Sequence, residues 1–70
     1  MARKSKITFG TVIVKEADVY DTPNYNTVPM SQFNFGKEVI IVSKADKTFY
    51  GIQVSPSIIG YIPREAVKVD

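Results

Sequence analysis

The closing third of the chain constrains the fold more than any other segment. Residues 49–54 and 58–62 are short apolar and aromatic runs separated by Ser55-Pro56-Ser57. Proline presets φ and cannot donate to a strand ladder, so it ends one strand before the next begins. Pro63 suits the first position of a helical turn over residues 63–66, because its missing N–H would be unpaired there anyway. With a short last strand at residues 67–69, this order predicts the end of a small all-β domain.

Two earlier runs also predict strands. Residues 11–14 and 39–42 are dense in β-branched side chains, which suit a pleated surface. Residues 16–36 are rich in Asp, Asn, Pro and Ser, which favour turns, but they also carry apolar side chains. We therefore expect a long ordered loop there. Five short strands and one helical turn predict a partly open barrel.

Length and charge predict one domain with a basic arm. The 70 residues contain no repeat, linker or cysteine, so apolar packing must stabilise the fold. Three of the nine basic residues, Arg3, Lys4 and Lys6, lie in the first six positions. We expect an arm at residues 1–8 and a domain at residues 9–70. Because no signal peptide or membrane span is evident, we expect a cytoplasmic location, or a virion-associated one if the protein is phage-encoded.

From about residue 12 to residue 69, the order of features resembles the bacterial SH3-like family. The matching features are a Val-x-x-x-Pro segment at residues 19–23, an approximate Phe-x-x-Gly-x-x-Val step at residues 33–39, the aromatic pair Phe49-Tyr50, and Gly60-Tyr61-Ile62-Pro63. The last motif also resembles the end of eukaryotic SH3 domains. The resemblance implies a small five-stranded SH3-like barrel with a short helical turn before the last strand. It also implies noncovalent recognition of cell wall or peptides, as in the bacterial members, or of proline-rich peptides, as in the eukaryotic ones.

The resemblance supplies a candidate ligand site. Its residues are Tyr20, Asp21, Tyr25, Tyr50, Tyr61 and Pro63. On the resemblance, Tyr20, Tyr50 and Tyr61 approach one another on the loop face, where tyrosine rings could stack on proline, sugar or nucleobase. Packing of these rings in the core or at its rim is the alternative.

Two departures from the family concern that site. The chain has no tryptophan, and either Phe49 or Tyr50 takes the position where the family has one. The usual Arg-Ser-Gly-Pro of the bacterial loop is Tyr-Asp-Thr-Pro at residues 20–23. We therefore expect weak binding of ordinary proline-rich peptides.

Catalysis is not indicated by the composition. Histidine and cysteine are absent, which removes the commonest general base, the usual thiol nucleophile and the best nitrogen and sulfur metal ligands. Glu16, Asp18 and Asp21 match no calcium motif. A solvated acidic loop is the favoured interpretation, and contact with a cationic partner is the alternative. We expect no enzymatic activity, no cofactor and no metal.

The run at residues 39–42 is apolar on both faces of its strand. If Val39 and Ile41 point inward, Ile40 and Val42 point outward and should be covered. The chain's own Ile7 and Phe9, or a second copy of the chain, are equal alternatives.

Two function classes follow from these observations. The first is a protein- or peptide-binding or assembly module, of phage or mobile-element type, which could form a homo-oligomer. The second is a small-barrel nucleic-acid-binding protein that uses Arg3, Lys4, Lys6 and surface tyrosines. From Ile7 onward the chain has six basic and seven acidic residues, and this near-neutral body argues against the second class. No membrane partner is expected.

Overall fold

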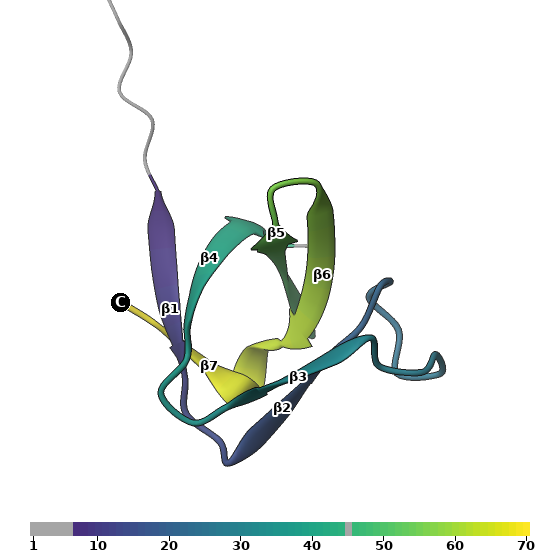
Figure 1. Ribbon diagram of the computed structural model, residues 1–70, viewed down its shortest axis with the longest axis horizontal. Helices are drawn as coiled ribbons and strands as arrows, with labels where there is room; N and C mark the ends of the chain where they lie inside the picture. Colours follow the sequence, from purple (N-terminus) through teal and green to yellow (C-terminus); the bar gives the residue numbers. More distant parts are fainter. Residues whose placement is uncertain (1–6, 45) are drawn as a thin grey trace, which may run out of the picture.

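The computed structural model describes residues 7–44 and 46–70, and in them the chain is all-β (Figure 1). Seven strands follow one another along the sequence, with one short 3-10 helix before the last. They are β1 (Thr8–Val12), β2 (Glu16–Val19), β3 (Ser31–Asn34), β4 (Glu38–Ser43), β5 (Phe49–Ser55), β6 (Ile58–Pro63), η1 (Arg64–Ala66) and β7 (Val67–Val69). None of the helical structure in the described residues is long and apolar enough to cross a membrane.

The strands form two antiparallel sheets. The larger has the order β6-β5-β4-β1-β7, and the smaller is the hairpin β2-β3. An isolated bridge between Tyr20 and Tyr61 joins the end of β2 to β6, with N–H to carbonyl distances of 2.8 and 2.7 Å in the two directions. The expected five-stranded barrel is found only in part: the strands of the described residues form a five-stranded sheet and a separate hairpin, and they do not close into a barrel.

The expectation of a loop over residues 16–36 is wrong, because its two ends pair as β2 and β3. The sequence of β2 alternates, so Ala17 and Val19 are buried at 3% and 0% exposure while Glu16 is exposed. This period of two indicates a half-buried strand. The Asp-, Asn- and Pro-rich stretch at residues 20–30, between the two strands, conceals that pattern.

The strand expected at residues 11–14 is displaced toward the N-terminus, and the other boundaries differ from the expected ones by at most one residue. β1 begins at Thr8 rather than residue 11, because its first residues pair with β4 from Thr8 opposite Ile41 to Thr11 opposite Glu38. The last residue of the expected arm at residues 1–8 is thus part of the sheet. The helical turn begins at Arg64, since Pro63 still ends β6. The last strand at residues 67–69 is confirmed.

The core lies between the curled five-stranded sheet and the β2-β3 hairpin that crosses it (Figure 1). Val12, Val19, Ile52 and Ile62 are its fully buried side chains, each at 0% exposure. They come from β1, β2, β5 and β6, so both sheets contribute to one apolar cluster.

The orientation expected for β4 is confirmed. Val39 is 4% exposed, whereas Ile40 and Val42 are 36% and 47% exposed. Phe9 lies opposite Ile40 in the β1-β4 pair, so the two side chains are neighbours on the same face, and both remain partly exposed at 38% and 36%.

Candidate functional site

A hollow of about 410 Å³ lies where β2, the loop that follows it, and η1 meet. We call it the acidic hollow. Its lining residues are Val14, Glu16, Ala17, Asp18, Tyr20, Tyr25, Pro63, Glu65 and Ala66. Tyr20, Tyr25 and Pro63 belong to the candidate ligand site taken from the sequence, so the structure brings these three of its six residues together.

The alternation of β2 places two carboxylates at the acidic hollow. Ala17 and Val19 point into the core, which leaves Glu16 and Asp18 on the opposite face of the strand. Gln32 lies opposite Asp18 on β3, and its Nε2 donates a hydrogen bond of 2.8 Å to Asp18 Oδ1. This bond holds the Asp18 side chain in one orientation, while the second carboxylate oxygen stays available.

Three aromatic rings pack together beside these carboxylates. The ring centres of Tyr20 and Phe49 are 5.9 Å apart and edge-on, and Tyr25 lies 5.7 Å from Tyr20 and 4.8 Å from Phe49. Tyr20 is 7% and Phe49 2% exposed, but Tyr25 is 52% exposed. Tyr25 is therefore the ring of this cluster that a ligand can contact over a large area.

Local hydrogen bonds position Tyr25 in its loop. Asn24 Oδ1 accepts from the Asn26 N–H at 2.7 Å, and the Thr27 hydroxyl donates to the Asn24 carbonyl at 3.0 Å. Such side-chain turns are typical of asparagine in loops. Packing of the ring removes water from the phenol and raises the pKa of Tyr25, and the negative charges of Glu65 and Asp46 act in the same direction.

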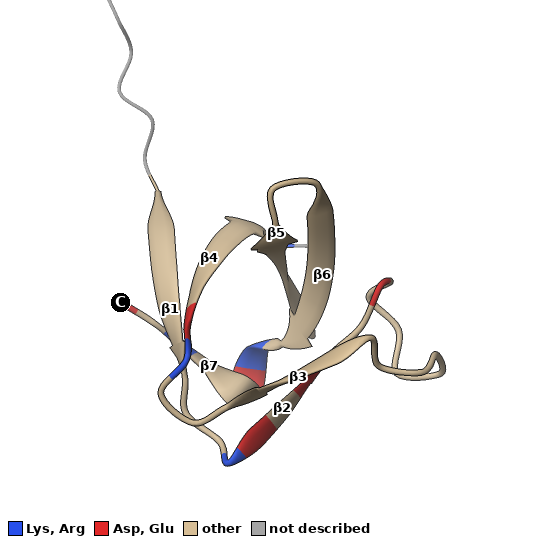
Figure 2. Ribbon diagram, viewed as in Figure 1, with Lys and Arg blue, Asp and Glu red and all other residues tan. Residues whose placement is uncertain are grey.

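The acidic hollow contains three carboxylates, of Glu16, Asp18 and Glu65, and no basic residue lines it. Figure 2 shows the acidic colour along β2 and on η1. Arg64 precedes Glu65 but is held elsewhere, with its guanidinium 4.7 Å from the ring centre of Tyr50 and its Nη2 donating to the Lys44 carbonyl at 2.8 Å. The hollow therefore has a negative potential that no neighbouring cation in its lining offsets.

The other candidate residues lie elsewhere. Tyr61 pairs with Tyr20 through the backbone but does not line the hollow. Asp21 is exposed in the loop beyond β2 and also lies outside the lining. Tyr50 is on the other face of β5 and lines a separate hollow, so the expected approach is wrong for Tyr50, whereas Tyr20 and Tyr61 are neighbours. Adjacent residues of a strand point to opposite faces, which separates Tyr50 from the others.

Arg3, Lys4 and Lys6 of the alternative nucleic-acid site lie outside the described residues. In residues 7–44 and 46–70, no group of three acidic side chains is arranged to hold a metal ion.

Sequence reasoning missed two parts of this site, Phe49 and Glu65. Phe49 lies opposite Pro63 in the β5-β6 pair. The ring of Phe49 packs on Tyr20, whereas the ring of Tyr50 lies on the other face of β5. The sequence feature that could have identified Phe49 as part of the site is its position at the start of the middle strand. Glu65 lies on the helical turn directly after Pro63, where proximity to β2 cannot be inferred from local pattern.

Comparison with known proteins does not identify a relative: no protein-family model matches the chain, and no curated protein matches it.

Proposed function

We propose that this chain is an SH3-like noncovalent binding module and that its acidic hollow binds a cationic, extended segment of a protein partner. The order of strands, the hairpin after the first strand and the helical turn before the last support the small SH3-like barrel. The observation that carries the proposed function is the half-exposed Tyr25 beside three carboxylates without a basic neighbour in the lining.

An arginine side chain of the partner suits this hollow better than a proline ring. A guanidinium can lie over the exposed Tyr25 ring and donate to the carboxylates of Asp18 and Glu65 together. Phe49, one of the two residues that could take the position of the family's tryptophan, is only 2% exposed and offers little surface for proline to stack on. Charge is therefore the main determinant of binding, and proline supplies at most an extended backbone.

The test is a fluorescence anisotropy titration with a labelled peptide that contains two arginines between prolines. In the double variant Asp18→Asn with Glu65→Gln, affinity should fall about tenfold or more, because charge-assisted hydrogen bonds are lost. The matched control is Glu38→Gln, which removes an exposed carboxylate in β4 that lies outside the hollow. Equal affinity of the wild type and the double variant, or no binding by the wild type at millimolar peptide, contradicts the proposal.

Of the features that suggested a nucleic-acid-binding function, only the basic residues of the N-terminal arm still support it. The tyrosines expected to stack on bases are divided between two faces, and the hollow that contains two tyrosines also contains three carboxylates, which repel phosphates. We therefore favour the protein-binding function.

A further inference from the structure

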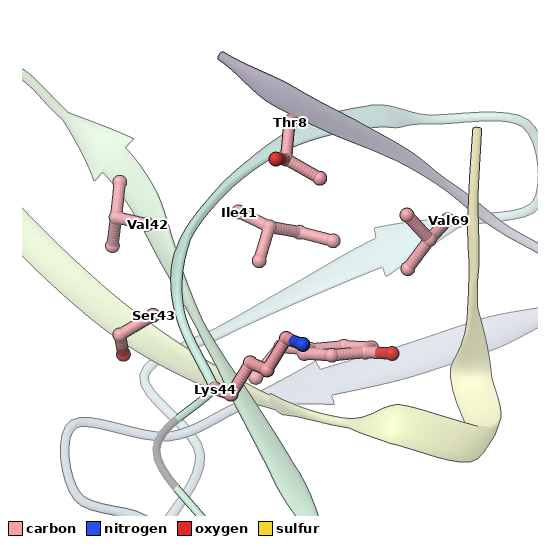
Figure 3. Close-up of a pocket in the computed structure, with 7 residues that line it drawn as sticks. Thr8, Ile41, Val42, Ser43, Lys44 and Val69 are labelled. Carbon is pink, nitrogen blue, oxygen red and sulfur yellow. The ribbon is translucent and has the colours of Figure 1, made fainter. Parts of the chain in front are cut away.

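A second hollow, of about 300 Å³, lies at one end of the curled five-stranded sheet. We call it the mouth. Its main lining residues are Thr8, Ile41, Val42, Lys44, Tyr50 and Val69. They come from the start of β1 and β5 and from the end of β4 and β7, which antiparallel pairing brings to the same end of the sheet. Figure 3 shows Thr8, Ile41, Lys44 and Val69 around one shared space.

The floor of the mouth is aliphatic and closed. Ile41 packs on the core from above, and Val42 and Val69 add apolar surface at 47% and 41% exposure. Below them, a Cβ atom added at Gly10 would lie 2.6 Å from Val67 Cγ1 and 3.1 Å from Ile41 Cδ1, so no space continues into the core. The volume of the hollow is at the lower end of the range of ligand pockets, so it has room for an aliphatic side chain together with the carboxylate of the same residue.

Polar groups at the rim are all suited to an anion. Within the described residues, the Lys44 ammonium has no ion pair, and neither the Tyr50 nor the Thr8 hydroxyl has a hydrogen-bond partner. No acidic residue lines the mouth. The Tyr50 ring is held by the Arg64 guanidinium 4.7 Å from its centre, and Arg64 is fixed in turn by its bond to the Lys44 carbonyl. An ammonium and a hydroxyl can each donate a hydrogen bond to a carboxylate, which accepts several.

We propose that the mouth binds the C-terminal carboxylate of a polypeptide whose last residue has a branched aliphatic side chain. The aliphatic side chain lies on Ile41, Val42 and Val69, and the carboxylate accepts hydrogen bonds from Lys44 and Tyr50. A chain end suits the site better than a free acid, because Ile7, 61% exposed and next to Thr8, provides further apolar surface for the residues that precede the last one. This site is separate from the acidic hollow and does not depend on its proposed function.

The test follows backbone amide signals of the ¹⁵N-labelled protein during titration with an acetylated Gly-Gly-Leu peptide. The free-acid peptide should shift the signals of Thr8, Ile41 and Val69, and the same peptide with a C-terminal amide should bind about tenfold more weakly, because the charge-assisted bond is lost. Equal binding of the two peptides, no shifts at millimolar peptide, or shifts confined to Tyr20 and Tyr25 would overturn the proposal.

Variants and a small-molecule control complete the design. Lys44→Met keeps the length of an exposed side chain and should weaken binding about tenfold, whereas Lys15→Met, in the turn before β2, should leave it unchanged. The Glu65→Gln variant should bind like the wild type, which separates this site from the acidic hollow. Free 4-methylpentanoate should bind more weakly than the peptide, and affinity equal to that of the peptide would overturn the assignment to a chain end.

Discussion

The acidic hollow and the mouth have opposite character, although residues that are neighbours in the sequence build them. Phe49 supports the acidic hollow and Tyr50 lines the mouth, and Glu65 lines the acidic hollow while Arg64 fixes the Tyr50 ring. In strand β5 a step of one residue changes the face, and in the 3-10 helix η1 a step of one residue rotates the side chain by about a third of a turn. A chain of this size can therefore place carboxylates at one site and cations at another without long charged segments.

The largest difference between the two sites should be in stability. Phe49→Ala removes a ring that is 2% exposed and packed between two tyrosines, so we expect a loss of about 3–5 kcal/mol in the free energy of unfolding. This is about the whole stability of a domain of this size. Tyr50→Ala should cost less, because that ring is only partly buried. Urea unfolding followed by circular dichroism measures both variants.

The comparison fails if Tyr50→Ala is as destabilising as Phe49→Ala. In that case the mouth would be a structural part of the core and not a site open to a ligand. Phe49→Leu provides a milder variant, which should stay folded and allow the free energy to be measured directly.

An intermediate effect concerns self-association of the protein through the outer face of β1 and β4. Phe9 and Ile40 form an exposed apolar pair on the outer face of β1 and β4, and the low net charge of +2 gives little repulsion between copies. We expect a second copy to cover this pair, as one of the two alternatives from the sequence has it. The double variant Phe9→Thr with Ile40→Thr should then lower the mass measured by light scattering while the fold is kept.

A wild-type protein that is monomeric at high micromolar concentration contradicts this expectation. Val42 is left unchanged in the variant because it lies at the shift of register in β4 and also lines the mouth. The acidic hollow, whose lining includes no residue of β1 or β4, should bind the arginine peptide of the proposed function equally well before and after the substitutions.

Elements that depend on residues close together in the sequence could be predicted, whereas elements that depend on pairing with distant residues could not. The last three elements follow local signals, such as Pro56 between two apolar runs and Pro63 at a helical turn, and they occur at nearly the expected residues. The β2-β3 hairpin was missed because its strands are only four residues each and lie on both sides of a turn-rich segment. Its strands are recognisable only once they are paired.

The candidate site was predicted in part for a similar reason. Tyr20, Tyr25 and Pro63 do line one hollow, but the choice between Phe49 and Tyr50 depends on which face of β5 meets Pro63. That face is set by the register of β5 with β6, where Phe49 lies opposite Pro63. A register cannot be read from one strand alone. The mouth was not foreseen, because its residues come from four strand ends far apart in the sequence.

The smallest effect should appear in the pH dependence of stability, and it concerns Tyr25. Because the pKa of this phenol is raised in the folded state, the folded protein keeps the proton to higher pH than the unfolded chain does. The stabilising contribution is complete below the ordinary tyrosine pKa of 10.0 and is lost as pH rises through the folded-state value. Tyr25→Phe removes the titrating group, so its stability should fall less than that of the wild type above about pH 10.

Urea unfolding of both proteins between about pH 8 and pH 11 measures this difference, and lysine titration, which affects both proteins in the same way, cancels in the comparison. Tyr61→Phe is the matched control, because it removes a tyrosine hydroxyl outside both hollows. A wild type and a Tyr25→Phe variant that lose stability in parallel would show that the phenol is not desolvated or near the carboxylates. The ring would then lie away from Phe49 and Glu65, and the acidic hollow would lose the aromatic surface that distinguishes it from the mouth.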